Sequence, residues 1–563
     1  MSRVRPEEKL KFSQRDRRGR GLLLAAVLLA VVPWAGGLEA QVWEVGEQGI
    51  ELPGGSQASA EFGRSVASGD FNGDGLRDLA VGSPSWSDGA EVGAGRVDIY
   101  YGTSSGLTQT ALFLEGDLAG QALGQALAAG DFDGDDVDEL AIGAPGFDVG
   151  AFPGAGRVFI LDFEAGMEIT FWDQEVAGVP GFAEDDDHFG YALSSGDFDN
   201  DQHEDLAVGI PFEDALLDNS GALTVLYGST TGLTATGSQL VMQTDVISPE
   251  RAGALFGATL AAGNFDADFG HWDLAVGYPG FPIDTVAGAG GVAVLFGGNG
   301  GLALGGLQQF DHADFGGVVE EDDGFGWALA AADFNRTGAC WVSFACRTDL
   351  AIGVPGQDIG AESEAGQIVI AFGGTGGIQV AGAQLFDQGD LSPLASNPEA
   401  GDRFGMVLQA EYFHGRNLDG PGPEISADDL VIGVPFEQWG STAGQGIVHL
   451  VFGGPSGLNS GEGQYRLAAP GLSSAPAAVN DYFGLGLALG DFDGDDWVDL
   501  AVGVPGRDAG SNNAGMVQVL YGALFADGFE SAATLNWSSS VPTLGGFGSL
   551  VVDDATSAEE RAP

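Results

Sequence analysis

Acidic side chains at regular spacing are the residues of this sequence that could do chemistry. The segment Asp491–Pro505 reads DFDGDDWVDLAVGVP, with carboxylates at its first, third, fifth and ninth positions. Alternate side chains of a short loop, together with one backbone carbonyl, can converge as oxygen ligands on a cation. Related segments occur seven times along the chain. The spacing therefore predicts a repeat architecture that carries metal-binding loops.

Four of the seven loops keep the full spacing, and in each the seventh position would contribute only its backbone carbonyl. Hard oxygen ligands on a flexible loop favour Ca²⁺ over Mg²⁺ or transition metals, so about four calcium sites are expected. The alternative is an acidic turn solvated by water. The predicted ligands are Asp70, Asn72, Asp74, Leu76 and Asp78 in repeat 1; Asp131, Asp133, Asp135, Val137 and Glu139 in repeat 2; Asp197, Asp199, Asp201, His203 and Asp205 in repeat 3; and Asp491, Asp493, Asp495, Trp497 and Asp499 in repeat 7.

The loop of repeat 4 departs from this spacing by one residue. Its closing acid comes late, so we expect at most a weaker fifth calcium site there. The residues concerned are Asn264, Asp266, Asp268 and Asp273.

Repeats 5 and 6 lose the spacing altogether. The loop of repeat 5 starts with Asp333 and Asn335 and is then extended through Cys340 and Cys346. These are the only two cysteines of the chain, and in an exported protein we expect them to form a disulfide that replaces the cation. Two unpaired thiols are the alternative. Repeat 6 begins at Glu411 and is expected to bind no metal.

The elements that must position these loops are short β-strands. Each loop runs into a buried D-L-A-V-G strand that a G-x-P ends, and a polar, glycine-rich stretch leads to a third strand such as GALTVLYG (Gly221 to Gly228). Strict alternation in the third strand predicts that it is half-buried. A weaker fourth strand follows. Each repeat opens with an F-G pair or its equivalent, near residues 62, 123, 189, 256, 325, 404 and 483.

Four antiparallel strands per repeat, seven times over, predict an all-β, seven-bladed β-propeller. A blade cannot bury both of its faces alone, so neighbouring blades must stack and the ring must close. The seventh repeat ends after its third strand near Gly522, whereas residues 41–52 precede the first opener. We therefore expect residues 41–52 to complete the seventh blade as its outer strand.

The pairing of F-G with G-x-P around a D-x-D-x-D-G-x-x-D-L loop resembles the FG-GAP repeats of integrin alpha-subunit propellers and their secreted bacterial relatives. The resemblance covers residues 41–522. It implies a calcium-binding, extracellular, seven-bladed propeller used in adhesion or ligand recognition. The sequence differs from integrins in having no inserted metal-dependent adhesion domain.

The first 40 residues differ in composition from the rest. They hold eight of the chain's 20 Lys and Arg, followed by the apolar run Leu22 to Val32 and a small residue at Ala40. This order is typical of a secretory signal peptide, and the run is short for the alternative, a retained membrane anchor. We therefore expect a secreted, extracellular or cell-surface protein without a membrane span in its mature chain. Residues 523–563 form a C-terminal tail outside the repeats.

Charge and motif content bear on the class of function. The net charge of −61 repels nucleic-acid phosphates and anionic membranes. The six histidines form no H-E-x-x-H motif, and no G-x-S-x-G motif occurs, so an enzyme is not expected. An extracellular carbohydrate-active enzyme, a lyase or hydrolase on a propeller scaffold, stays the alternative because paired carboxylates are abundant.

The topology also predicts which face binds a partner. In an antiparallel blade the loops between the first two strands, here the acidic ones, share one face of the ring, and the loops between the second and third strands and between blades emerge together on the opposite face. Those other loops vary most in sequence, and variable loops on a rigid scaffold are where binding is usually found. We expect a monomeric recognition or adhesion module for an extracellular protein or polysaccharide.

Overall fold

The computed structural model describes the repeat region and four short strands outside it. The described residues are 2–3, 11–13, 42–45, 551–552 and 59–521, the last range with gaps at 88, 90, 109–111, 164–166, 267, 269, 336–346, 392–396, 412–426, 439–442, 459–463, 469–478 and 508–512. The predicted signal peptide lies almost entirely outside these residues, as do Cys340, Cys346 and nearly all of the tail.

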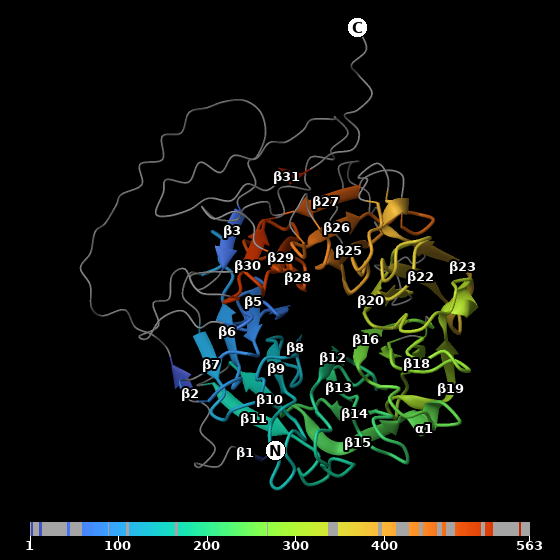
Figure 1. Cartoon of the computed structure of the whole chain (residues 1–563). Coiled ribbons are helices and arrows are strands. Elements are labelled where there is room, and N and C mark those ends of the chain that lie inside the picture. Colours follow the sequence, from blue (N-terminus) through green and yellow to red (C-terminus); the bar gives the residue numbers. More distant parts are fainter. Residues whose placement is uncertain are drawn as a thin grey trace, which may run out of the picture.

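Seven antiparallel sheets follow one another in chain order around a ring (Figure 1). Four strands form the core of every sheet, which confirms the seven-bladed propeller. In order from the axis outward, the blades are β4 (Ser65–Gly69), β5 (Asp78–Ser83), β6 (Arg96–Tyr100) and β7 (Leu112–Glu115); β8 (Leu127–Gly130), β9 (Glu139–Ala144), β10 (Arg157–Asp162) and β11 (Glu168–Trp172); β12 (Ala192–Gly196), β13 (Asp205–Ile210), β14 (Ala222–Tyr227) and β15 (Thr234–Met242); β16 (Thr259–Gly263), β17 (Asp273–Gly277), β18 (Val292–Phe296) and β19 (Ala303–Phe310); β20 (Leu329–Ala332), β21 (Asp349–Val354), β22 (Gln367–Gly374) and β23 (Gly377–Phe386); β24 (Val407–Glu411), β25 (Asp429–Val434), β26 (Ile447–Val451) and β27 (Gln464–Ala468); and β28 (Gly486–Gly490), β29 (Asp499–Gly503), β30 (Val517–Leu520) and β3 (Val42–Val45).

A few short elements lie outside this pattern. Three sheets carry a fifth, outermost strand of two or three residues: β2 (Lys11–Ser13) beside β7, β1 (Ser2–Arg3) beside β11, and β31 (Val551–Val552) beside β27. Helical structure among the described residues is limited to α1 (Gln243–Val246) and two 3₁₀ turns, η1 (His312–Phe315) and η2 (Gln388–Asp390).

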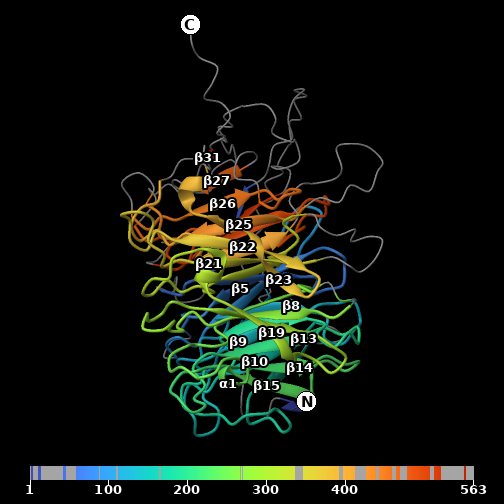
Figure 2. The ribbon, with the colours of Figure 1, turned by 90° about the vertical axis from the view of Figure 1, so that its right-hand side faces the viewer.

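The ring closes where the first and last repeats meet. The seventh sheet takes its outer strand from the N-terminal side of the first repeat, because β3 pairs antiparallel with β30 over four residues, from Val42 opposite Leu520 to Val45 opposite Val517. The innermost strands of neighbouring blades contact one another all the way round, and β28 contacts β4. Figure 2 shows the same ring from the side.

The hydrophobic core lies between blades. One buried cluster joins Phe132 of blade 2 to Phe189 and Leu206 of blade 3, and every pair of adjacent blades shares such a cluster. The third strands are therefore covered on both faces, and β14 is buried along its whole length. The expectation of half-buried third strands was wrong, because alternation reports polarity and the neighbouring blade covers the polar face as well.

The opener of each blade is also bonded to the blade before it. Phe189 forms a parallel bridge with Gly156, and its N–H donates to the carbonyl of Ala155 at 2.8 Å. A side chain at Gly156 would place its Cβ 2.3 Å from the Phe189 nitrogen, and the φ of +90° also favours glycine there. The bridge between Phe62 and Gly515 repeats this contact across the closure of the ring.

Candidate metal centres

The acidic loops join the first and second strands of their blades and are shaped by hydrogen bonds to their own carboxylates. Asp491 accepts the N–H groups of Gly494, Asp495 and Asp496 at 2.7, 3.2 and 2.9 Å. Asp495 in turn accepts the N–H of Trp497 at 2.9 Å. Equivalent bonds occur in the loops that begin at Asp70, Asp131 and Asp197. The four regular loops therefore share one local structure.

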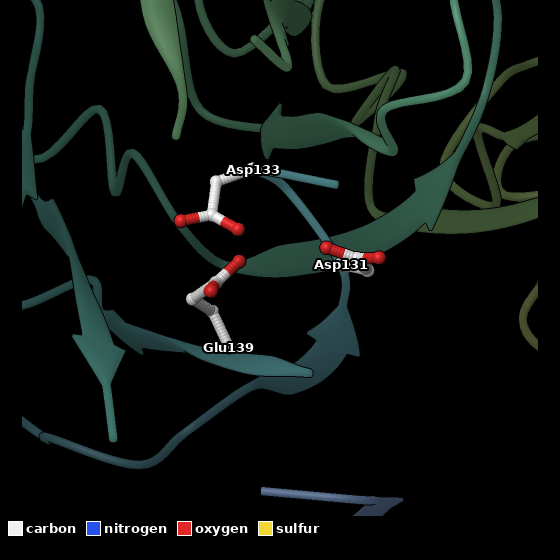
Figure 3. Close-up of side chains that lie close together, drawn as sticks. All are labelled: Asp131, Asp133 and Glu139. Atoms are coloured by element: carbon white, nitrogen blue, oxygen red, sulfur yellow. The ribbon is translucent and has the colours of Figure 1, made fainter. Parts of the chain in front are cut away.

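In three of these loops the first, third and ninth acids converge. Each acid offers one carboxylate oxygen, and the three oxygens of a group lie within 4.8 Å of one another. Figure 3 shows the group of blade 2, in which Asp133 and Glu139 face each other with Asp131 beside them. The three groups are Asp131, Asp133 and Glu139; Asp197, Asp199 and Asp205; and Asp491, Asp493 and Asp499.

The fifth-position acids Asp135, Asp201 and Asp495 do not belong to these groups. Each has a carboxylate oxygen that accepts the N–H of the seventh residue of its own loop, at 2.9 to 3.0 Å. For the seventh position, the carbonyl groups of Leu76, Val137, His203 and Trp497 stay predicted calcium ligands.

The third-position acids show whether the residues of these loops fit a cation. In blades 3 and 7 the Oδ1 atoms of Asp199 and Asp493 are buried, yet no group in the described part of the chain donates a hydrogen bond to them. A buried carboxylate oxygen without a donor is costly. A hard cation between the three acids would satisfy it, so the residues present fit a calcium ion.

The ninth acid has a second role, as an acceptor of backbone N–H groups, that the spacing of the loop did not predict. Asp205 is fully buried, and its two oxygens accept the N–H groups of Phe198 and Gly228 at 2.8 and 2.9 Å. In the irregular blade 4, Asp273 accepts from Phe265 and Gly297 at 2.7 and 2.9 Å. The equivalent acids of blades 5 and 6, Asp349 and Asp429, accept from the glycine that ends the third strand. This carboxylate ties three segments of a blade together whether or not the metal spacing is kept.

Burial disfavours the ionised form of these ninth acids. Desolvation raises the pKa of Asp78 to about 7 and the pKa values of Glu139 and Asp205 to about 8, although backbone hydrogen bonds act in the opposite direction. The other loop acids raise these pKa values further. A cation in the loop would reverse this effect, because an opposite charge favours the ionised carboxylate.

Blade 1 keeps the loop structure but replaces the third acid by an amide. Asp70 and Asp74 make the bonds described above, and the Nδ2 of Asn72 lies 3.4 Å from Oδ1 of Asp78. Asp78 accepts the N–H groups of Phe71 and Gly102 as the other ninth acids do. The structure thus brings Asn72 and Asp78 together.

Blade 4 arranges its acids differently. Asn264 donates to the carbonyl of Asp268 at 2.8 Å, and the imidazole of His271 lies 3.2 Å from Asp268 Oδ2. The Oδ1 atoms of Asn264 and Asp268 are buried and receive no hydrogen bond from the described residues, as in the regular loops. Asp266 and Asp273 complete the set predicted for a weaker fifth site. In blade 5, the region of the predicted Cys340–Cys346 disulfide lies outside the described residues.

Around the axis the loops are hydrogen-bonded to one another. The N–H of the residue before the ninth acid donates to the carbonyl of the first loop residue in the preceding blade, and Arg77 makes this bond to Asp491 across the ring closure. Ordering one loop therefore constrains its neighbours. The printed pairs, at 2.8 to 3.1 Å, are Arg77–Asp491, Asp138–Asp70, Glu204–Asp131, Trp272–Asp197, Thr348–Asn264 and Asp428–Asp333.

The opposite face of the ring gathers the exposed apolar side chains. Among the described residues, ten of the thirteen exposed large hydrophobic side chains lie in loops between the second and third strands or between blades. The most exposed are Leu216 and Phe182, at 85% and 80%. The ten are Val92, Leu118, Phe152, Phe182, Tyr191, Leu216, Leu217, Val318, Trp327 and Val479. We call this side the loop face.

Two buried pairs of carboxyl groups lie beneath the loop face. In blade 3, burial and the neighbouring Glu213 raise the pKa of Asp187 to about 7, and Glu213 itself is raised to about 7 by burial. In blade 6 the equivalent groups are Asp402 and Glu437, also almost fully buried. Blade 7 has Arg507 at this position, and its guanidinium lies 2.7 Å from Asp481. Blades 3 and 6 thus place two acids where blade 7 forms an ion pair.

The described histidines pack against aromatic rings or bond to neighbouring polar groups. His312 is fully buried beside the carbonyl of Val318 and the amide of Gln367, and His449 packs edge-on against Phe404. His188 packs against Phe212, and burial lowers its pKa. No helix in the described part of the chain is long and apolar enough to cross a membrane.

Comparison with known proteins identifies four FG-GAP repeats in the chain. The family model matches residues 62–100, 123–161, 189–226 and 483–520, which are blades 1, 2, 3 and 7. These are the four blades with regular acidic loops.

The chain has homologues among integrin alpha chains and phospholipases. Integrin alpha-PS2 of Drosophila melanogaster is 31% identical over 222 residues, which are 38% of this chain and 15% of that protein. Integrin alpha-3 of Mus musculus is 34% identical over 163 residues, covering 28% of this chain and 14% of that protein. Human phosphatidylinositol-glycan-specific phospholipase D is 31% identical over 182 residues, covering 30% of this chain and 21% of that enzyme. The chain thus matches about a fifth or less of the length of these relatives.

Among solved structures, a mutant of AofleA from Arthrobotrys oligospora aligns with a TM-score of 0.35 and 12% identity, covering 75% of this chain and 88% of that one.

Proposed function

We propose that this chain, a propeller with FG-GAP repeats and integrin alpha homologues, is an exported calcium-binding recognition module. In this proposal it binds an extracellular protein or polysaccharide through the loop face, and calcium ions brace the opposite side of the ring. The gathering of exposed apolar side chains on the loop face is the observation that carries the proposal. Loops that a rigid scaffold positions are where binding residues are concentrated.

Calcium has a structural role in this proposal. The ligands would be the first, third and ninth acids of blades 2, 3 and 7, with Asp70, Asn72 and Asp78 in blade 1. When bound, the ion supplies positive charge that holds these oxygens together. Because the loops are hydrogen-bonded in sequence around the axis, their order stiffens the ring that presents the loop face.

An enzymatic function is the second candidate, since a phospholipase D is among the homologues. The match covers 21% of that enzyme, and the described histidines are occupied in packing or in contacts with the acidic loops. The surroundings of these side chains favour recognition over catalysis.

Binding by variants of opposite regions tests the proposal. We would immobilise fibronectin, laminin, collagen and a set of extracellular polysaccharides and measure binding of the full chain by biolayer interferometry in about 2 mM Ca²⁺, a concentration in the range of weak extracellular calcium sites. The double variant F182S/L216S removes two exposed apolar side chains from the loop face. The control L304S/V380S removes two from the outer strands β19 and β23, where they are 43% and 40% exposed.

We expect F182S/L216S to lose at least about tenfold in affinity and the control to bind as the unmodified chain does. Equal loss in both variants, or binding that only the control weakens, would place recognition on the outer rim and overturn the proposal. Absence of binding to every immobilised protein and polysaccharide would overturn it as well.

A further inference from the structure

The loop face contains a defined pocket between blades 4, 5 and 6. Its volume is about 290 Å³, and its lining includes Leu255, Asp322, Trp327, Glu364, Arg403 and Met406. These residues come from the openers and loops of three consecutive blades. We call it the Trp327 pocket.

One wall of the pocket is an aromatic ring that is held in place yet half exposed. Trp327 directly follows the Phe325–Gly326 opener, and its backbone N–H donates to the carbonyl of Gly324 at 2.9 Å. A Cβ at Gly324 would lie 3.4 Å from the indole, so the ring rests against a residue without a side chain. Trp327 is 43% exposed although large aromatic residues are usually buried. An exposed aromatic side chain is therefore available to a ligand.

The polar groups of the pocket include both donors and acceptors. The guanidinium of Arg403 bonds to Glu364 through Nη2 and Nε at 2.6 and 3.1 Å, and both side chains stay substantially exposed. Arg403 also lies over the ring of Phe436 at 5.5 Å. The carboxylate of Asp322 lies beside Gly288, where a Cβ would meet its Oδ1 at 2.3 Å. The pocket therefore holds a guanidinium and two carboxylates near one aromatic face.

This combination selects among ligand classes by charge. An anionic ligand is repelled by the net charge of −61 and by Asp322 and Glu364. A cationic ligand is attracted by the net charge but offers no acceptor to the exposed guanidinium of Arg403. A neutral sugar ring has hydroxyls that both donate and accept, together with an apolar C–H face that can pack on indole.

We propose that the Trp327 pocket binds a hexose unit of a neutral polysaccharide or glycan. Trp327 packs against the C–H face of the sugar ring, and Asp322, Glu364 and Arg403 bond to its hydroxyls. This inference rests on the proposed function and specifies the ligand class and the part of the loop face that receives it.

The test is binding of the full chain, with calcium, to an array of neutral oligosaccharides and intact neutral polysaccharides such as glucans, mannans and galactans. W327A removes the aromatic wall, and D322A removes one carboxylate while leaving that wall in place. W272A is the matched control, because Trp272 is 42% exposed, lies between β16 and β17 on the opposite face and is not a predicted calcium ligand. Thermal unfolding of each variant shows whether it is folded.

We expect the unmodified chain and W272A to bind the same neutral glycans, with W327A weaker by about tenfold or more and D322A weaker by less. Binding to intact polysaccharides but not to short oligosaccharides would identify the polymer as the source of the sugar. If no neutral glycan binds, or if folded W327A and D322A both bind unchanged, the inference is wrong. Binding of matrix proteins that F182S/L216S abolishes would then leave the proposed function standing without it.

Discussion

Blades 1, 2, 3 and 7 differ from blades 4, 5 and 6 in the acidic loop, although each of the seven blades is a sheet with the same four-stranded arrangement. The regular loops are closed by bonds to their first acid, and three of them bring three carboxylates within 4.8 Å. In blade 4, Asp268 is drawn toward His271 instead. The family model for FG-GAP repeats matches only the four regular blades.

The ninth and third acids differ in what they bond to. The ninth acid accepts backbone N–H groups in regular and irregular blades alike, for example Asp205 in blade 3 and Asp273 in blade 4. The third acid has a buried oxygen without a donor in blades 3 and 7. We infer that the ninth position is kept for the architecture of the blade and the third for a cation.

Calcium itself should produce the largest effect. At dissociation constants of about 10⁻³ M, 10 mM Ca²⁺ would stabilise each occupied site by about 1.4 kcal/mol, and four sites by about 6 kcal/mol in total. We expect D199A and D493A each to remove the calcium stabilisation of about one site, and D266A in blade 4 to remove less. Chemical denaturation with Ca²⁺, with Mg²⁺ and with chelator measures this.

If chelator leaves the free energy of unfolding unchanged, the acidic loops are solvated turns and bind no calcium. If D266A removes as much calcium stabilisation as D493A, the regular and irregular loops do not differ in calcium binding.

Removing the ninth acid should cost about as much in either class of blade. D205A leaves two N–H groups without an acceptor, and D273A leaves two together with the longer bond from Asp266 at 3.2 Å, at a cost of about 2–6 kcal/mol in each case. In chelator we expect the two losses of unfolding free energy to agree. In calcium, D205A should lose more, since it also removes a ligand. A D273A variant as stable as the unmodified chain would contradict the architectural role.

The buried acid pairs should make the free energy of unfolding fall as pH rises, in a regular blade and in an irregular one. Burial raises the pKa of Glu213 to about 7 and that of Glu437 to about 8, above their value of 4.5 when exposed. The folded state therefore retains protons that the unfolded chain has lost, and unfolding free energy should fall as pH rises from about 4.5 to 8. The facing groups are Asp187, Glu184, Asp214 and Gln174 in blade 3, and Asp402, Glu399 and Gln388 in blade 6.

E213Q and E437Q should each reduce that fall by about 1–2 kcal/mol and raise the melting temperature at pH 8. Denaturation curves between pH 5 and 8, all in chelator, separate this effect from calcium binding. A fall of the same size in the double variant E213Q/E437Q would show that these pairs do not cause it.

The smallest effect is expected from the ion pair that joins two regular loops. Arg77 lies 2.8 Å from Asp138, with 51% of the arginine side chain exposed, so solvent screens the pair. R77A should cost about 0.2–1 kcal/mol, and less at high salt. A loss above about 2 kcal/mol would mean that Arg77 holds the ring together beyond this pair.

Much of the fold could be read from the sequence because each repeat carries its own signals. The F-G opener or its equivalent, the D-L-A-V-G strand or a close variant of it, and the closing G-x-P occur seven times, and a four-stranded unit repeated seven times requires a closed ring. The regular acidic spacing likewise located the loops in which Asp131, Asp133 and Glu139 converge.

Other features could not be read in this way because they arise between repeats. The alternation of GALTVLYG predicted a half-buried strand, yet the next blade buries β14 on both faces. The signal for the structural role of the ninth acid was present, since Asp273, Asp349 and Asp429 persist in loops that lost the metal spacing. The N–H groups that they bond to could not be found without the structure.

The repeat, the strand order and the acids available to a cation follow from the sequence alone, because they depend on residues close together in the chain. The packing of the blades is needed to know which oxygens converge, which acids accept backbone N–H groups, and that Asp322, Trp327 and Arg403 line one pocket. These features join segments from different strands or different blades. Their distances are set by how the blades pack around the axis, which the local spacing of residues does not encode.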